Sequence, residues 1–297
     1  MTIDDPESMA RALEETGNYR VLRRLDLMRQ LETNDGTAVR RGIFLDIEST
    51  GLDVSNSEPI EFAMVPFDYT ADGRIFAVHA ALHQFNEPSE PIPPEITAIT
   101  GLTDEHVAGH KLDRSTIDAF ADQAAVILAH NAAFDRPFAE RISPIFAVKP
   151  WGCTMCDVPW SEEGVEGRRL SDLLSRFSYF FDAHRAVDDC QAGISLATMR
   201  LPTSGRRVLD RLLEVARRPT WRIFADGAPF DAKDALKSRR YRWNTDPGVG
   251  PRAWYIDVGP DRLEPEIAFL KGGILRSNVT PPMYEITAFQ RYSSRSQ

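Results

Sequence analysis

Short apolar runs separated by segments of helical periodicity dominate the middle of the chain. Apolar runs of roughly four to eight residues, bounded by turn residues, are typical of buried strands. We therefore predict strands at residues 42–47, 60–68, 74–82, 125–129 and 151–155. Apolar positions three or four residues apart predict helices at residues 114–121, 132–142, 171–177 and 185–199.

The order of these elements predicts the fold class. The first three strands follow one another closely, so we expect them to be antiparallel neighbours. The later strands alternate with helices, which is typical of parallel strands joined by crossover helices. The sequence therefore predicts an α/β fold with a mixed five-stranded sheet flanked by helices.

Different patterns flank this central region. Residues 7–31 carry apolar positions at helical spacing interrupted near Gly17, which predicts two short helices, and the polar residues 32–40 predict a linker. The turn residues 202–205 precede a predicted α+β module, with helices at 206–217, 229–239 and 264–270 and strands at 221–225, 241–243, 254–258 and 283–292. We therefore divide the chain into an N-terminal helical extension and linker (1–40), a central domain (41–202) and a small C-terminal α+β domain (203–297).

The charge is distributed unevenly between these parts. The whole chain has a net charge of −9, from 35 Lys and Arg against 44 Asp and Glu. Residues 1–202 carry 18 basic and 33 acidic side chains, whereas residues 203–297 carry 17 basic and 11 acidic ones. An acidic region needs cations before a polyanion can approach it, while a basic region attracts a polyanion directly.

The composition also bears on the compartment. The chain has no run of about 18 apolar residues, and its first residues are acidic, unlike a secretory signal. Three cysteines are too few for a disulfide framework, which favours a reducing compartment. We therefore expect a cytoplasmic protein without a membrane partner.

Carboxylates occur where several predicted strands and helices meet. Asp46 and Glu48 stand two residues apart at the end of the first strand, so their side chains project from the same face. Asp135 lies in the first turns of a helix after the strand at 125–129, and Asp189 follows His184 by five positions. Paired acids beside a buried strand favour a hard divalent cation. For Asp46 and Glu48 alone, an exposed strand end remains an alternative.

Taken together and in this order, these segments resemble the DEDDh family of 3′→5′ exonucleases. This family includes the epsilon proofreading subunit of DNA polymerase III, RNase T and oligoribonuclease. The resemblance covers about residues 42–201 and rests on three segments, 44–52, 130–135 and 184–189. Ser49 is a local departure, because threonine is commoner there in this family.

The resemblance implies a ribonuclease H-like fold and a set of site residues. Asp46, Glu48, Asp135 and Asp189 would bind two Mg²⁺ or Mn²⁺ ions, and His184 would be the general base. Two such cations can stabilise both the attacking and the leaving oxygen of a phosphodiester displacement. The carboxylate of Asp188 should point away from this group, because neighbouring residues on a helix are about 100° apart.

The same resemblance implies contacts to the 3′-terminal nucleotide. These contacts would come from the backbone of Thr50, Gly51 and Leu52 and from the side chain of Asn131, with His130 as a further candidate. Asn131 also precedes a predicted helix, where asparagine is a favoured N-cap, and the two roles can coexist. For His130, a supporting position behind the site is the alternative.

The predicted function is hydrolysis of phosphodiester bonds at the 3′ end of DNA, releasing nucleoside 5′-monophosphates. RNA is the alternative substrate, and a non-catalytic adaptor that binds nucleic acid or a polymerase is the alternative of another class. A DNA polymerase partner, in replication or repair, is a further expectation. The C-terminal domain interleaves basic and aromatic side chains that suit nucleic acid. They are Lys233, Lys237, Arg239, Arg240, Tyr241, Arg242, Trp243, Trp254 and Tyr255. The alternative is a solvated basic helix face over a small aromatic core.

Overall fold

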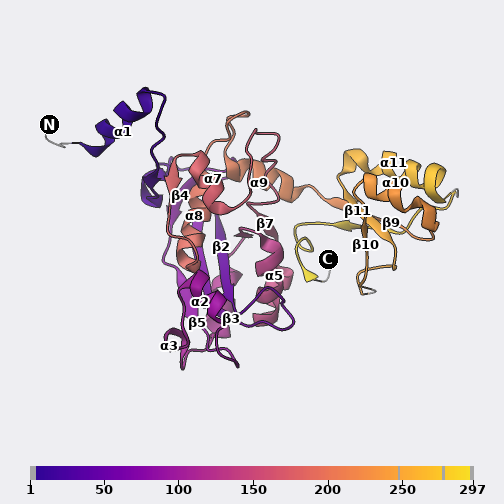
Figure 1. Ribbon diagram of the computed structural model, residues 1–297, viewed down its shortest axis with the longest axis horizontal. Coiled ribbons are helices and arrows are strands. Elements are labelled where there is room, and N and C mark those ends of the chain that lie inside the picture. Colours follow the sequence, from indigo (N-terminus) through magenta and orange to yellow (C-terminus); the bar gives the residue numbers. More distant parts are fainter. Residues whose placement is uncertain (1–4, 247, 276–277, 295–297) are drawn as a thin grey trace.

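The computed structural model describes residues 5–246, 248–275 and 278–294 and contains a larger and a smaller body (Figure 1). The larger body is built on a mixed sheet with the strand order β4-β3-β2-β6-β7, and β5 pairs with the same edge of β3. Its strands are β2 (Arg40–Ser49), β3 (Pro59–Tyr69), β4 (Ile75–Val78), β5 (Leu82–Phe85), β6 (Val126–Ala129) and β7 (Trp151–Cys153). β2 pairs antiparallel with β3 and parallel with β6, as the element order predicted.

Helices cover both faces of this sheet. They are α2 (Pro94–Thr100), α3 (Asp104–Val107), α4 (Arg114–Asp122), α5 (Ala132–Ile142), α6 (Ile145–Val148), α7 (Leu170–Arg176), α8 (Ala186–Thr198) and α9 (Val208–Arg217). One core lies between the sheet and α7, α8 and α9, and a second lies against α4 and α5. The predicted α/β class is confirmed.

Some details differ from the predicted elements, and the predicted strand at 283–292 is confined to Met283–Ile286. The predicted strand at 74–82 is two strands, β4 and β5, so the sheet has six strands among the described residues instead of five. The second predicted helix near the N-terminus is also wrong. After α1 (Pro6–Glu15), the chain forms the short strand β1 (Arg23–Arg24), which pairs with β8 (Tyr179–Phe180), and the 3₁₀ turn Leu27–Gln30. Tertiary pairing there outweighs the helical spacing of the leucines.

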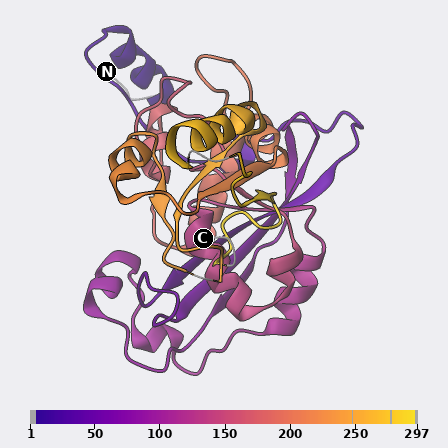
Figure 2. The same ribbon diagram turned by 90° about the vertical axis from the view of Figure 1, so that its right-hand side faces the viewer.

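The smaller body is a four-stranded antiparallel sheet with helices on one face (Figures 1 and 2). Its elements are β9 (Thr220–Ala225), the 3₁₀ turn Phe230–Ala232, α10 (Lys233–Ser238), β10 (Arg242–Trp243), β11 (Trp254–Val258), α11 (Pro260–Phe269), the π-helical turn Leu270–Leu275 and β12 (Met283–Ile286). This body has its own apolar core, whose members include Ile223, Ile256 and Ile267. The side chains of α9 pack in the core of the larger body, so the cores divide after Arg217, whereas the sequence suggested a boundary at 202.

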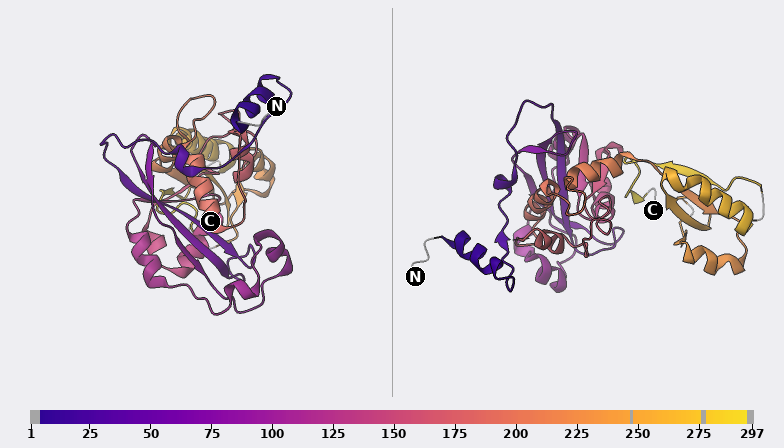
Figure 3. Two further views of the ribbon diagram at one scale, coloured as in Figure 1. Left: turned by 90° about the vertical axis from the view of Figure 1, so that its left-hand side faces the viewer. Right: turned by 90° about the horizontal axis from the view of Figure 1, so that it is seen from above.

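The chain returns to the larger body after β12 (Figure 3). The backbone N–H of Trp151 on β7 donates to the carbonyl of Ala288 at 2.9 Å. The guanidinium of Arg136 on α5 is fully buried and donates to the carbonyls of Ala288, Phe289 and Arg291 at 3.3, 2.6 and 2.7 Å. Residues 287–293 therefore form a return segment that satisfies a buried cation of the larger body.

No helix within the described ranges has the length and apolar character needed to cross a membrane.

The return segment predicts a stability effect at Arg136. Substitution Arg136→Leu should lower the free energy of unfolding by about 3 kcal/mol, because it leaves buried carbonyls without donors and breaks the ion pair with Glu140. Urea denaturation followed by circular dichroism measures this. Arg114→Leu is the matched control, since Arg114 is exposed and its ion pair with Asp118 should contribute at most about 1 kcal/mol. Equal losses in the two variants would contradict the role given to the return segment.

Candidate functional site

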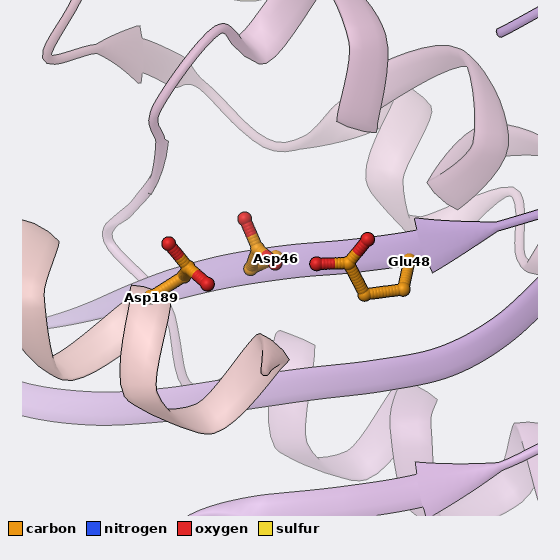
Figure 4. Close-up of side chains that lie close together, drawn as sticks. All are labelled: Asp46, Glu48 and Asp189. Atoms are coloured by element: carbon orange, nitrogen blue, oxygen red, sulfur yellow. The ribbon is translucent and has the colours of Figure 1, made fainter. Parts of the chain in front are cut away.

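Two of the predicted carboxylates lie on one face of the central strand β2. Ile43, Leu45 and Ile47 point into the core beside α4 and α5, so the alternate residues face α8. These alternate residues are Phe44, which packs in the opposite core, and then Asp46 and Glu48. The alternation of the strand therefore turns both acids toward the N-terminal part of α8 (Figure 4).

The third carboxylate reaches this point because α8 lies very close to β2. A Cβ atom at Gly193 would stand 2.1 Å from the ring of Phe44, so only glycine allows this approach. Asp189 is one helical turn before Gly193 and lies on the same side of the helix. Single ligand oxygens of Asp46, Glu48 and Asp189 consequently lie within 4.8 Å of one another (Figure 4).

Asp135 supplies the fourth carboxylate from α5. Its side chain is 1% exposed, and Oδ1 accepts a hydrogen bond from the backbone N–H of Ile47 at 3.1 Å. Oδ2 has no hydrogen-bond partner in the described part of the chain. The charge of Asp135 is close enough to Asp46 to raise its pKa. A buried carboxylate oxygen without a donor is the kind of ligand that a cation would satisfy.

The electrostatics of the group also fit a cation. Burial, and then the neighbouring carboxylates, raise the pKa of Asp46 well above its usual range. Burial likewise raises the pKa of Asp135, that of Glu48 to about 8 and that of Asp189 to about 6. Carboxylates crowded together in a desolvated space stay protonated unless a cation neutralises them. The group therefore suits hard divalent cations, which prefer carboxylate oxygens.

His184 lies at the edge of this group, just before α8. Its backbone is left-handed (φ 72°), and its side chain is exposed. The carboxylate of Asp189 accepts hydrogen bonds from the backbone N–H groups of His184 (2.7 Å) and Arg185 (3.1 Å). The predicted base and a predicted metal ligand are therefore linked within a single turn of chain. Asp188 is exposed and does not belong to the cluster, as predicted.

The residues expected to contact the 3′-terminal nucleotide are placed unequally. Leu52 is 85% exposed, and the N–H of Thr50 donates to the carbonyl of Glu58 at 2.9 Å, while Gly51 lies against the hydroxyl of Ser57. Asn131 has φ 70° and is exposed, and its side chain makes no capping hydrogen bond to α5. Asn131 therefore occupies the N-cap position of α5 as predicted, but it does so through its backbone, and its exposed side chain does not cap the helix.

His130 is held in place by its neighbours. One ring nitrogen bonds to the hydroxyl of Thr154 and the other to the carbonyl of Arg168, both at 2.8 Å. Burial lowers the pKa of His130 to about 4. Both nitrogens are occupied, so the ring supports the loop beside Asn131, which was the alternative interpretation.

The sequence interpretation missed Glu61, which lies opposite Glu48 on β3. Its carboxylate is 1% exposed and accepts from the guanidinium of Arg185 (3.1 Å) and the N–H of Ala186 (3.2 Å), and it bonds to Nε2 of His83 (2.6 Å). Glu61 thus caps the first N–H of α8 from a different element. No local pattern marks this role, because its partners are distant in sequence.

Comparison with known proteins gives matches over this body. The exonuclease family model RNase_T matches residues 43–197, more than half of the chain. The DNA polymerase III PolC-type protein of Streptococcus suis is 36% identical over 98 residues, and that of Streptococcus agalactiae serotype III is 33% identical over 98 residues. Each match covers 32% of this chain and 6% of the relative, so the chain spans a small part of these polymerases.

Two solved structures are similar in part. Exonuclease X in complex with 5′ overhanging duplex DNA is 23% identical with a TM-score of 0.44, covering 59% of this chain and 99% of that one. The zinc-bound complex of Escherichia coli exonuclease I with single-stranded DNA is 14% identical with a TM-score of 0.48, covering 85% and 66%.

The raised pKa values predict opposite effects of pH with and without cations. In the metal-free protein the folded carboxylates keep protons that the unfolded chain releases, so stability should fall as the pH rises from about 4 to about 8. Cations replace these protons, so Mg²⁺ or Mn²⁺ should raise the melting temperature more at about pH 8 than at about pH 6. Differential scanning calorimetry with each metal and with chelator measures both. An increment independent of pH, or absent, would contradict the metal assignment.

The network of Glu61 predicts a positioning effect on catalysis. Glu61→Gln weakens the links to Arg185 and His83, so His184 should lose its orientation and kcat should fall by on the order of 10-fold to 10²-fold, with KM nearly unchanged. The matched control is Asp68→Asn, because Asp68 lies on the same strand and bonds to Arg41 and His79 away from the carboxylates. Steady-state kinetics and melting temperatures are needed for both. A fall in stability with unchanged kcat would leave Glu61 a purely structural role.

Proposed function

Because the chain belongs to the exonuclease family whose model matches residues 43–197, we propose that it hydrolyses phosphodiester bonds at the 3′ end of DNA. The main observation behind this proposal is that single carboxylate oxygens of Asp46, Glu48 and Asp189 lie within 4.8 Å of one another. In addition, a buried oxygen of Asp135 has no hydrogen-bond donor among the described residues. The similarity to PolC-type DNA polymerases supports DNA over RNA as the substrate. The products would be nucleoside 5′-monophosphates.

The four carboxylates would hold two Mg²⁺ or Mn²⁺ ions. When bound, these ions would stabilise the charge on the attacking and leaving oxygens of an in-line displacement. The residues of the chain would position these ions. The β2 strand fixes two ligands, and α5 and α8 each add one from a different side. The acidic group repels a polyanion unless its charge is neutralised, so cations held by these carboxylates would also favour the approach of the substrate.

His184 is the group in this proposal that moves a proton. Histidine is the commonest general base in enzymes, and an imidazole nitrogen can accept the proton of an attacking water. Its exposed side chain and left-handed backbone place it on a short turn, where it can approach the substrate. The hydrogen bond from its N–H to Asp189 ties this turn to the carboxylate group.

The nucleotide contacts follow from the same placement. We assign the 3′-terminal nucleotide to the exposed Leu52 and its neighbours Thr50 and Gly51, together with the exposed side chain of Asn131. His130 would act only through the backbone beside Asn131. An association with a DNA polymerase, in replication or repair, rests on the resemblance to PolC-type proteins and is a separate question from the chemistry.

The proposed function predicts a defined product pattern. Single-stranded DNA, duplex DNA and RNA, each labelled at the 5′ or the 3′ end, would be incubated with the full chain and with Mg²⁺, Mn²⁺ or chelator. We expect metal-dependent release of the 3′-terminal mononucleotide and progressive shortening of the 5′-labelled strand, with DNA degraded faster than RNA. Faster hydrolysis of RNA would overturn the choice of DNA, and internal cleavage would overturn the exonuclease assignment.

Matched variants test whether the hydrolysis comes from this site or from a contaminating nuclease. Asp189→Asn should abolish hydrolysis, whereas Asp188→Asn, which removes the neighbouring exposed carboxylate, should leave it nearly unchanged. His184→Ala should lower kcat by on the order of 10²-fold or more, since that is the usual contribution of a general base. Full activity in Asp189→Asn would exclude this site.

A further inference from the structure

The C-terminal body has a patch of basic and aromatic side chains that the proposed active site does not use. This basic–aromatic patch consists of Phe230, Lys233, Lys237, Trp243 and Trp254. Phe230 is 88% exposed and Trp243 is 51% exposed, which is unusual for such large apolar rings. Trp254 is half-buried and anchors the patch to the core, while both lysines are exposed.

The fold separates this patch from the other basic and aromatic residues of the same body. Arg239 and the buried Tyr241 both bond to the carboxylate of Glu266, at 2.8 and 3.0 Å. Arg242 bonds to Asp257 at 3.1 Å and lies over the buried ring of Tyr255 on the opposite face of the sheet. The interleaved sequence motif therefore divides into a structural half and a half that faces solvent.

In the half that faces solvent, each lysine ammonium lies beside an aromatic ring. Nζ of Lys233 lies 6.0 Å from the ring centroid of Phe230, and Nζ of Lys237 lies 6.0 Å from that of Trp254. The rings of Trp243 and Trp254 meet edge to face at 5.7 Å. In the described residues neither lysine forms an ion pair, although Asp231 and Asp234 are nearby in the chain. The positive charge of the patch is therefore available to a ligand.

We propose that the basic–aromatic patch binds single-stranded nucleic acid, outside the site that cleaves it. Bases would stack on Phe230 and Trp243, and phosphates would lie near Lys233 and Lys237. A protein partner fits less well, because lysine is depleted at protein interfaces. The excess of basic residues after position 202, 17 against 11 acidic ones, adds charge complementarity to a polyanion. The proposal rests on the proposed function only in taking nucleic acid as the ligand.

Binding can be measured without hydrolysis. The full-length Asp46→Asn variant in chelator would be titrated into 5′-fluorescein-labelled oligo(dT), oligo(rU) and duplex DNA, with fluorescence anisotropy as the readout. In this background Phe230→Ala and Trp243→Ala should each weaken oligo(dT) binding by about 5-fold or more, the usual effect of losing one stacked base. The double variant Lys233→Gln, Lys237→Gln should make the plot of log association constant against log salt concentration shallower, reducing the magnitude of its slope by about 1.4.

Controls distinguish the patch from general charge and from folding. Lys111→Gln removes a charge from an exposed lysine of the larger body and should leave oligo(dT) binding unchanged. Phe230 is so exposed that its substitution cannot unfold the core, and it therefore guards against a misfolded Trp243→Ala protein. Unchanged affinity in Phe230→Ala and in the double lysine variant would overturn the proposal, as would equal affinity for duplex DNA. Because cleavage is not read out, a failure of the exonuclease assignment leaves this test intact.

Discussion

Four carboxylates share one desolvated space at the end of β2, and the rest of the larger body is arranged to hold them there. Ionised carboxylates this close together repel one another, and burial makes their ionisation still less favourable. Both effects raise the pKa values of Asp46 and Glu48. Packing must offset that cost. On one side of the sheet, the alternate apolar residues of β2 pack in the core. On the other side, the contact of Gly193 with Phe44 brings α8 close to β2.

The same arrangement links metal binding to the predicted base. Asp189 uses its carboxylate to hold the N–H groups of His184 and Arg185, while Glu61 holds Arg185 and the first N–H of α8. Helix N-termini favour negative charge, so both acids stabilise the start of α8 as well as the site. A ligand that binds the carboxylate of Asp189 therefore contacts the same group that holds the turn carrying His184.

Local patterns in the sequence were sufficient for the elements that carry the acids. The apolar run before Asp46 and the strand and helix around Asp135 appear as predicted, because each is specified by its own alternation or spacing. Residues 21–31 were misassigned, since pairing of β1 with β8 depends on residues more than a hundred positions away. Glu61 and Arg136 were missed for the same reason. Their partners come from α8 and from the return segment, and nothing in their own neighbourhoods indicates those contacts.

The return segment changes how the two bodies act together. A domain attached at one end can sample many orientations, whereas here the C-terminal body is held through α9 before β9 and through residues 287–293 after β12. Two attachments reduce the orientations open to the smaller body, and they raise the local concentration of anything bound to it near the larger one. Arg136, which binds the return segment, directly follows Asp135 on α5. One helix therefore carries both a carboxylate of the site and the cation that fastens the C-terminal body beside it.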